Sequence, residues 1–124
     1  MDSLPEDALV VRGGQNLPSS FVQGSGVKAG AGGTLDDLSV NSSAGLSLAE
    51  LTAPDPVSGY PGIPHRQVGV TTVGEVQRAG GDVRPSPTRG NPNHATLGGL
   101  TPEDASRLFL PTRPNPGRRD RRKE

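Results

Sequence analysis

Large apolar side chains are scarce in this chain, and that scarcity limits what it can fold into more than any other feature. The 124 residues include two Phe, one Tyr and no Trp, so the large core candidates are Phe21, Tyr60, Ile63 and Phe109. A domain folds only if buried apolar surface offsets lost conformational entropy. We therefore expect a thin core, or one that a partner completes. A largely disordered accessory protein is an alternative, because 18 Gly and 13 Pro make up a quarter of the chain.

The absence of Cys bears on the compartment and on metal binding. Small secreted domains with a thin core usually carry disulfides, so we expect a cytoplasmic protein. Residues 1–7 are acidic and lack the apolar segment of a secretory signal, and no apolar run reaches the length of a membrane span. Export by a signal-independent route fits the same features. With two His and no Cys, no spacing resembles a zinc site, and we expect no bound metal.

The net charge of zero is divided unevenly along the chain. Residues 111–124 hold six Lys or Arg and two Asp or Glu, a net of +4, which leaves −4 for the rest. We expect a single small domain over residues 1–110 and a disordered basic tail over 111–124. Such a tail predicts weak, salt-dependent contact with nucleic acid or an acidic protein. It has no aromatic residue to stack on a base.

Short apolar runs separated by Gly and Pro predict the strands. They cover residues 8–11, 35–41, 67–70, 82–84 and 94–97, the last being the final strand of the chain. Between them, residues 23–34 predict a flexible loop, preceded by Phe21 and Val22 as an anchor. The predicted fold class is α+β: a small twisted, mostly antiparallel sheet with two or three short helices, long loops and a disordered C-terminal tail.

Three capping patterns predict where helices begin. Residues 47–50 (Ser-Leu-Ala-Glu) and 72–75 (Thr-Val-Gly-Glu) have the spacing of a capping box, in which a hydroxyl and a carboxylate satisfy backbone N–H groups. Residues 101–104 (Thr-Pro-Glu-Asp) combine an N-cap with Pro at the first helical position. We expect the helix that begins there to bury Ala105, Leu108 and Phe109.

Three residues on the predicted strands form the strongest candidate site. Arg12 ends the first strand beside Gly13 and Gly14, so a guanidinium fork could bind a phosphate where the backbone is open to a ligand. Ser39 lies on the second strand, and its hydroxyl can bond to a ribose or an amide. His94 begins the last predicted strand and can polarise or position a ligand group near neutral pH.

The segments that carry these residues resemble a known family. They are residues 10–14 (Val-Val-Arg-Gly-Gly), 33–41 (Gly-Thr-Leu-Asp-Asp-Leu-Ser-Val-Asn) and the His-x-x-Leu strand at 94–97. Together they look like the small ADP-ribosyltransferase-like toxins of bacteria, the compact kind delivered by type VI secretion or encoded beside an antitoxin. The resemblance covers about residues 8–100, and its motifs are short.

The resemblance implies roles for individual residues. Arg12, with Gly13 and Gly14, would hold NAD, and Ser39 would support its ribose; with His94, Arg12 and Ser39 form the predicted catalytic set. A cognate antitoxin or immunity protein would be the partner. The family's third motif usually supplies a Glu that orients a ribose hydroxyl, and the last predicted strand has none. A non-enzymatic binding module therefore stays open as the alternative function.

Each of these residues also has an ordinary structural interpretation. Arg12 could form a surface ion pair with Glu6 or Asp7. Ser39 could face solvent on a half-buried strand, since it alternates with Leu38 and Val40. His94 could belong to a turn, because it follows Asn-Pro-Asn.

Overall fold

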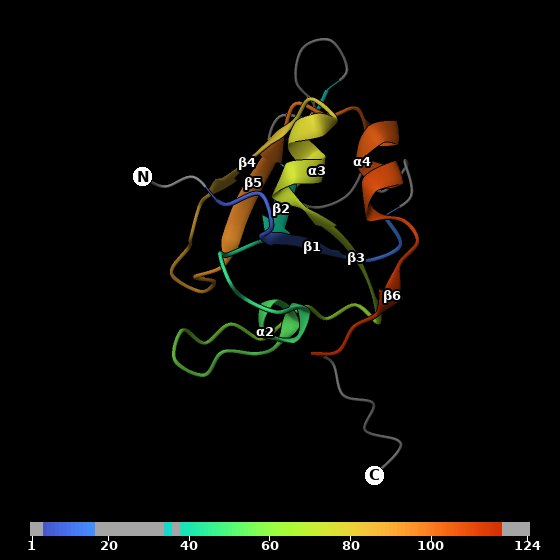
Figure 1. Ribbon diagram of the computed structural model, residues 1–124. Coiled ribbons are helices and arrows are strands. Elements are labelled where there is room, and N and C mark those ends of the chain that lie inside the picture. Colours follow the sequence, from blue (N-terminus) through green and yellow to red (C-terminus); the bar gives the residue numbers. More distant parts are fainter. Residues whose placement is uncertain (1–3, 17–33, 36–37, 118–124) are drawn as a thin grey trace.

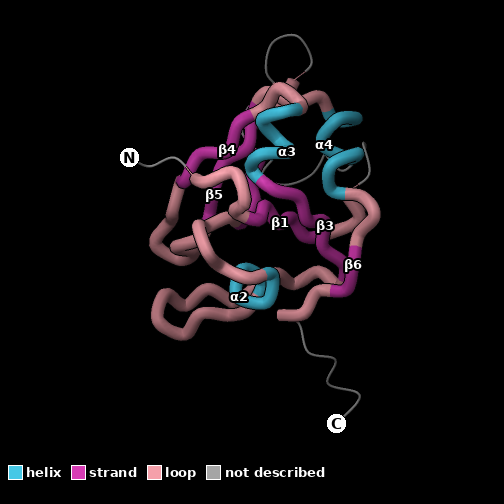
Figure 2. The backbone as a smooth tube through the Cα atoms, viewed as in Figure 1, coloured by secondary structure: helices cyan, strands magenta, loops and turns pink. Residues whose placement is uncertain are grey.

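The computed structural model describes residues 4–16, 34–35 and 38–117, and within them a six-stranded antiparallel sheet with helices on both faces. The strand order is β4-β5-β2-β1-β3-β6. Helices α3 and α4 lie on one face and α2 on the other (Figures 1 and 2). The strands are β1 (Leu9–Gly13), β2 (Leu38–Asn41), β3 (Gln67–Thr72), β4 (Asp82–Pro85), β5 (His94–Gly98) and β6 (Arg113–Pro114). The helices are α2 (Leu48–Thr52), α3 (Val73–Arg78) and α4 (Pro102–Phe109).

The predicted α+β class is confirmed, and each of the five predicted strands has a counterpart in the sheet. The second differs most, because β2 begins at Leu38 rather than at residue 35. The prediction that the 94–97 strand is the last was wrong, since β6 follows it. The predicted anchor at Phe21 and Val22 and most of the predicted loop 23–34 lie outside the described residues.

Residues 111–117 belong to the folded body, so the predicted boundary between domain and tail at residue 110 was wrong. Arg113 and Pro114 pair with Val68 and Gln67 of β3. Asn115 is only 5% exposed, and its side-chain amide donates to two backbone carbonyls. These contacts hold the segment although it has almost no apolar content. Residues 118–124, which hold most of the basic residues of the predicted tail, lie outside the described residues.

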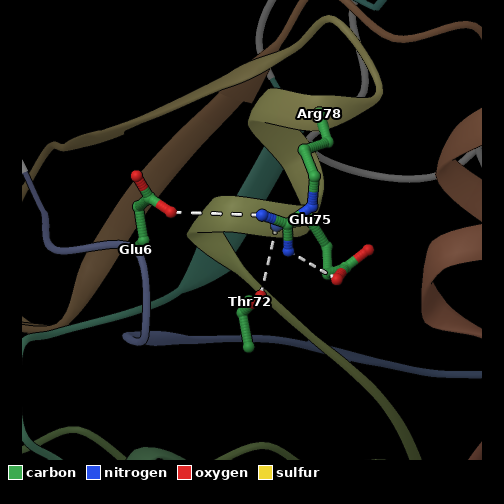
Figure 3. Close-up of polar contacts among 4 residues, drawn as sticks. All are labelled: Glu6, Thr72, Glu75 and Arg78. Carbon is green, nitrogen blue, oxygen red and sulfur yellow. Dashed lines mark hydrogen bonds and ion pairs between the residues drawn. The ribbon is translucent and has the colours of Figure 1, made fainter.

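The capping patterns hold to different degrees. Ser47 begins α2 with a complete capping box. The Ser47 hydroxyl accepts from the backbone N–H of Glu50, and the Glu50 carboxylate accepts from the backbone N–H of Ser47. Thr72 caps α3 with only the first of these bonds, at 3.2 Å from the Glu75 nitrogen (Figure 3). The Glu75 carboxylate instead accepts from Arg78 at 2.6 Å, an interaction that raises the pKa of Arg78. The sequence pattern therefore predicted both helix starts but overstated the second cap.

Helix α4 begins as its sequence predicts, with the Thr101 hydroxyl accepting from the Asp104 nitrogen at 3.1 Å. It buries Ala105 and Phe109 completely, while Leu108 is partly buried against the same cluster. Gly69 of β3 permits this packing, since a Cβ there would lie 2.6 Å from the Phe109 Cβ. A missing side chain on β3 thus lets α4 approach the sheet closely.

The sheet separates two unequal apolar clusters. The face under α3 and α4 carries the larger one, with thirteen buried residues contributed by four strands, both helices and adjoining loops. The face under α2 carries four buried residues, which are Val11, Leu51, Ile63 and Val68. The second face is therefore only partly filled by apolar side chains, and the candidate site lies there.

Candidate functional site

A pocket opens where β1 separates from β2. Between these two strands only Val11 and Asn41 are in register, whereas β1 and β3 pair along the whole of β1. The pocket has a volume of about 520 Å³, which is within the range of small-molecule sites. Its walls come from residues 11–16, from residues 39–41 of β2, from Tyr60 and residues 63–65, and from Asn91 and His94.

The five predicted site residues all line this pocket. Arg12, Gly13 and Gly14 come from the end of β1, Ser39 from β2 and His94 from the start of β5. Strand pairing explains this convergence, because β2 lies between β1 and β5 in the sheet. The geometry brings the residues together, while their roles remain predictions.

Arg12 crosses the gap between the two strands. Its Nη1 donates to the backbone carbonyl of Ser39 at 2.7 Å. This bond ties β1 to β2 beyond the point where their register ends. Burial lowers the pKa of the guanidinium, but an arginine remains charged at neutral pH. On β1, Arg12 lies opposite Gly69, where a Cβ would face Phe109 of α4, so the Arg12 side chain leaves the strand on the face of α3 and α4. From there its guanidinium reaches the backbone of Ser39 and brings a positive charge to the pocket wall. The Glu6 ion pair that the sequence suggested for Arg12 is formed by Arg78 instead, with 4.0 Å between the charged atoms.

The two glycines are required for different reasons. A Cβ on Gly13 would collide with the ring of His65 and would lie 2.6 Å from Cγ2 of Ile63, so the loop before β3 can close over β1 only because this side chain is missing. Gly14 has φ +100°, a conformation that other residues rarely adopt. Its N–H donates to the Gln67 carbonyl at 2.9 Å. The glycines therefore shape the pocket wall, whether or not a ligand also uses their backbone.

Ser39 and His94 project from the same face of the sheet. On β2, Leu38 and Val40 are buried in the larger cluster, so Ser39 and Asn41 point to the opposite, pocket face. In the pairing with β5, Asn41 lies opposite His94 and Ser39 lies opposite Thr96. Ser39 and His94 are thus diagonal neighbours, a relationship that places side chains roughly 7–8 Å apart.

His94 is held by Ser86, the residue directly after β4. Nδ1 of His94 lies 2.9 Å from the Ser86 hydroxyl and 3.0 Å from the Ser86 carbonyl. The same hydroxyl lies 2.8 Å from that of Thr96. The sequence suggested that His94 could be a turn residue, and the backbone N–H of His94 does donate to the Asn91 carbonyl at 3.2 Å. It closes that turn and begins β5 as well.

A network of buried amides beside the pocket was missed from the sequence. The side-chain nitrogen of Asn41 donates to the Leu51 carbonyl and to the Tyr60 hydroxyl, each at 2.9 Å. Its oxygen accepts from the Asn91 side chain at 2.9 Å. Asn41 lies on the same side of β2 as Ser39, yet it is only 6% exposed, and its amide bonds to α2 and to the Tyr60 loop. An Asn at the end of an apolar strand was the only available signal.

Two further lining residues, His65 and Asn16, were also missed. His65 was considered only as a metal ligand, and its side chain lies over Gly13. Asn16 has φ +57° and is 1% exposed, and its amide donates to the carbonyls of Arg12 and Gly14 at 3.1 and 3.0 Å. Within the described ranges, its Oδ1 is the one buried side-chain polar atom without a hydrogen-bond partner. Asn16 thus fixes the turn that follows Arg12 at the end of β1.

Arg12, His65 and His94 line the pocket, and the described residues that line it include no Asp or Glu. Across the described part of the chain, no group of three or more His, Cys, Asp or Glu is placed to hold a metal ion. No helix within the described ranges is long and apolar enough to cross a membrane.

Comparison with known proteins adds no relative. No protein-family model matches the chain, and no similar protein is found among curated sequences or solved structures. The site must therefore be interpreted from its own chemistry.

Proposed function

We propose that this pocket binds NAD and that the protein is an ADP-ribosyltransferase-like toxin domain. The observation that carries the proposal is the convergence of Arg12, Ser39 and His94, three residues distant in sequence, on one cavity. Arg12 would face the pyrophosphate, Ser39 a ribose, and the backbone of Gly13 and Gly14 would lie against the ligand.

The electrostatics of the cavity support an anionic ligand. A guanidinium binds a phosphate through charge-assisted, often bidentate hydrogen bonds, and Arg12 lines this pocket. Partial burial of Arg12 strengthens that attraction, because a lower local dielectric reduces screening. The volume of about 520 Å³ also suits a nucleotide-sized ligand.

A second candidate is a binding module that holds the dinucleotide without transferring it, because no Glu is found among the described residues that line the pocket. In ADP-ribosyl transfer, the bond from the ribose C1′ to nicotinamide breaks and nicotinamide leaves with its electron pair. A nucleophile on the target then bonds to C1′ and loses a proton. The resembled family uses a Glu near that ribose, and the part of the pocket lining that the structure describes has none. A protein without the transfer step would act through a partner, such as a cognate antitoxin.

Two features of the sequence extend the proposal. The absence of Cys supports a cytoplasmic protein. Residues 118–124 hold five of the six basic residues of the predicted tail, which supports a weak electrostatic contact with nucleic acid or an acidic protein. A binding assay repeated at two salt concentrations tests that contact, because it should weaken steeply as salt rises.

Calorimetric titration of NAD into purified protein tests the binding. We expect Arg12→Gln to reduce affinity at least tenfold, which corresponds to about 1.4 kcal/mol. Ser39→Ala should reduce it several-fold without changing stability, because among the described residues only its backbone carbonyl, and not its hydroxyl, takes part in a side-chain hydrogen bond. Arg66→Gln is the matched control, since Arg66 is exposed and does not line the pocket. Unchanged affinity in Arg12→Gln, or no binding to the wild-type protein, would refute the proposal.

Incubation with radiolabelled NAD and a cell lysate separates the two candidates. Transfer of label to protein, with release of nicotinamide, supports the transferase, and both should disappear in Arg12→Gln. Binding without either product supports the binding module. A growth defect on expression, lost in the same variant, would support a toxin.

A further inference from the structure

The contacts of His94 determine which of its ring nitrogens carries hydrogen. Nδ1 lies within hydrogen-bond distance of two Ser86 oxygens, the hydroxyl and the backbone carbonyl. A carbonyl oxygen can only accept a hydrogen bond. An unprotonated Nδ1 at 3.0 Å would set two lone pairs against each other. Nδ1 must therefore be the donor, and Nε2 carries the lone pair whenever the ring is neutral.

The Ser86 hydroxyl completes this arrangement. It accepts from Nδ1 and can donate its own hydrogen to the hydroxyl of Thr96 at 2.8 Å. Strand geometry holds Ser86 in place: β4 and β5 are paired up to Pro85 and Ala95, and the Ser86 N–H continues the ladder with a 3.0 Å bond to the His94 carbonyl. Ser86 does not itself line the pocket, whereas His94 does.

We propose that His94 presents Nε2 to the pocket as a hydrogen-bond acceptor for a ribose hydroxyl, and that Ser86 is the residue that positions it. This inference rests on the proposed function, because it assigns the group that would take the hydroxyl bond for which the resembled family uses Glu. The unprotonated nitrogen of a neutral imidazole can accept a hydrogen bond from a hydroxyl. It has no hydrogen to donate to a phosphate oxygen, which is itself an acceptor. The His94 end of the pocket therefore selects the sugar, while Arg12 provides the positive charge.

The first test uses the ligand-free protein. Long-range ¹H–¹⁵N NMR spectra, recorded at a pH where a histidine ring is neutral, distinguish the two tautomers of His94. We expect hydrogen on Nδ1. Hydrogen on Nε2 would overturn the inference whether or not NAD binds, so this result is independent of the proposed function.

The second test uses small sugar phosphates. Ribose 5-phosphate should bind several-fold more tightly than its 2-deoxy or its 3-deoxy analogue. His94→Asn should remove that preference, because its side-chain nitrogen ends at the position of Nδ1 and can still face Ser86 while nothing replaces Nε2. No binding of ribose 5-phosphate, or equal binding of all three compounds, would overturn the inference. Ribose 5-phosphate binding with this preference, but no NAD binding, would refute only the proposed function.

Variants of Ser86 test its positioning role. Ser86→Ala should weaken ribose 5-phosphate binding several-fold, because Nδ1 loses one of its two partners and the ring is less well oriented. Ser86→Thr keeps a hydroxyl and should restore affinity. Urea midpoints within a few tenths molar of the wild type would show that both variants are folded. If Ser86→Ala leaves affinity unchanged, Ser86 does not position His94.

Discussion

The two faces of the sheet are built by different means. The face under α3 and α4 is closed by thirteen buried apolar residues, and both helices pack on it (Figure 1). The face under α2 has four such residues. Amide hydrogen bonds hold its loops in place, and the pocket lies on this face. Residues that alternate along one strand serve both faces, as Val40 and Asn41 do on β2. The first face supplies most of the apolar burial, which leaves the second free to hold a polar pocket.

Asparagine substitutes for apolar burial on the pocket face. Asn41 joins α2 to the Tyr60 loop, Asn91 joins β2 to the turn before β5, and Asn115 joins the C-terminal segment to residues 63–65. These amide bonds join segments far apart in the sequence, which keeps the loops in place with little apolar area. Such a face should respond differently to substitution from the helix-covered one.

Phe109→Ala should have the largest effect, because it empties the centre of the helix-covered face. Phe109 is fully buried, and its loss should cost about 3–5 kcal/mol. That is a large share of the stability of about 5–15 kcal/mol usual for a domain. Urea unfolding followed by circular dichroism should show a protein that is marginally folded or unfolded. Leu110→Ala is the control, since Leu110 is 38% exposed. Similar midpoints for the two variants would contradict the proposed division between the faces.

Asn41→Ala should have the next largest effect, and it should act on stability and on the pocket together. It leaves the Leu51 carbonyl, the Tyr60 hydroxyl and the Asn91 amide without their partner, at a cost of about 2–3 kcal/mol. NAD affinity should fall as well, since Asn41 lines the pocket. Tyr60→Phe removes only one of these bonds and should cost about 1 kcal/mol. Equal losses in the two variants would contradict this account, because they would mean that the bonds from Asn41 to Leu51 and Asn91 add nothing to stability.

Local signals in the sequence predicted a large share of the fold and the convergence of the site. The caps at Ser47 and Thr101 depend on side chains three residues apart, and alternation on β2 depends on neighbours, so both can be recognised in a short segment. Arg12, Ser39 and His94 were identified by their places on predicted strands. Their common pocket then follows from β2 lying between β1 and β5.

Contacts between distant segments account for what the sequence did not predict. Arg113 and Pro114 have no apolar side chains to indicate a strand, and Asn115 bonds to carbonyls 52 and 50 residues away. The position of His65 depends on the missing side chain of Gly13, on the other side of a strand pair. Neither relationship leaves a pattern within one segment, so both required the structure.

Asn115→Ala should have a smaller effect that tests the link between the C-terminal segment and the site. It leaves the carbonyls of Ile63 and His65 without a donor, at a cost of about 1–2 kcal/mol. NAD affinity should fall several-fold because residues 63–65 form one pocket wall. Asn93→Ala is the control, since Asn93 is only partly buried and does not line the pocket. If Asn115→Ala lowers stability but leaves affinity intact, the segment supports the fold without shaping the site.

Glu50→Gln should have the smallest effect, and its pH dependence sharpens the account of α2. The backbone N–H of Ser47 and then its hydroxyl lower the pKa of Glu50 below the ordinary value of 4.5. A lowered pKa in the folded state means that the ionised carboxylate contributes stability above the unfolded value, and that this is lost as pH falls through the folded value.

The urea midpoint of Glu50→Gln should therefore lie slightly below the wild-type midpoint at neutral pH. The difference should stay constant as pH falls toward the ordinary range of Glu and then diminish. Glu103→Gln provides the comparison, because Glu103 is in the first turn of α4 and has no capping bond of its own. A difference that persists in strong acid would mean that a neutral hydrogen bond, and not the carboxylate charge, holds the start of α2 on the pocket face.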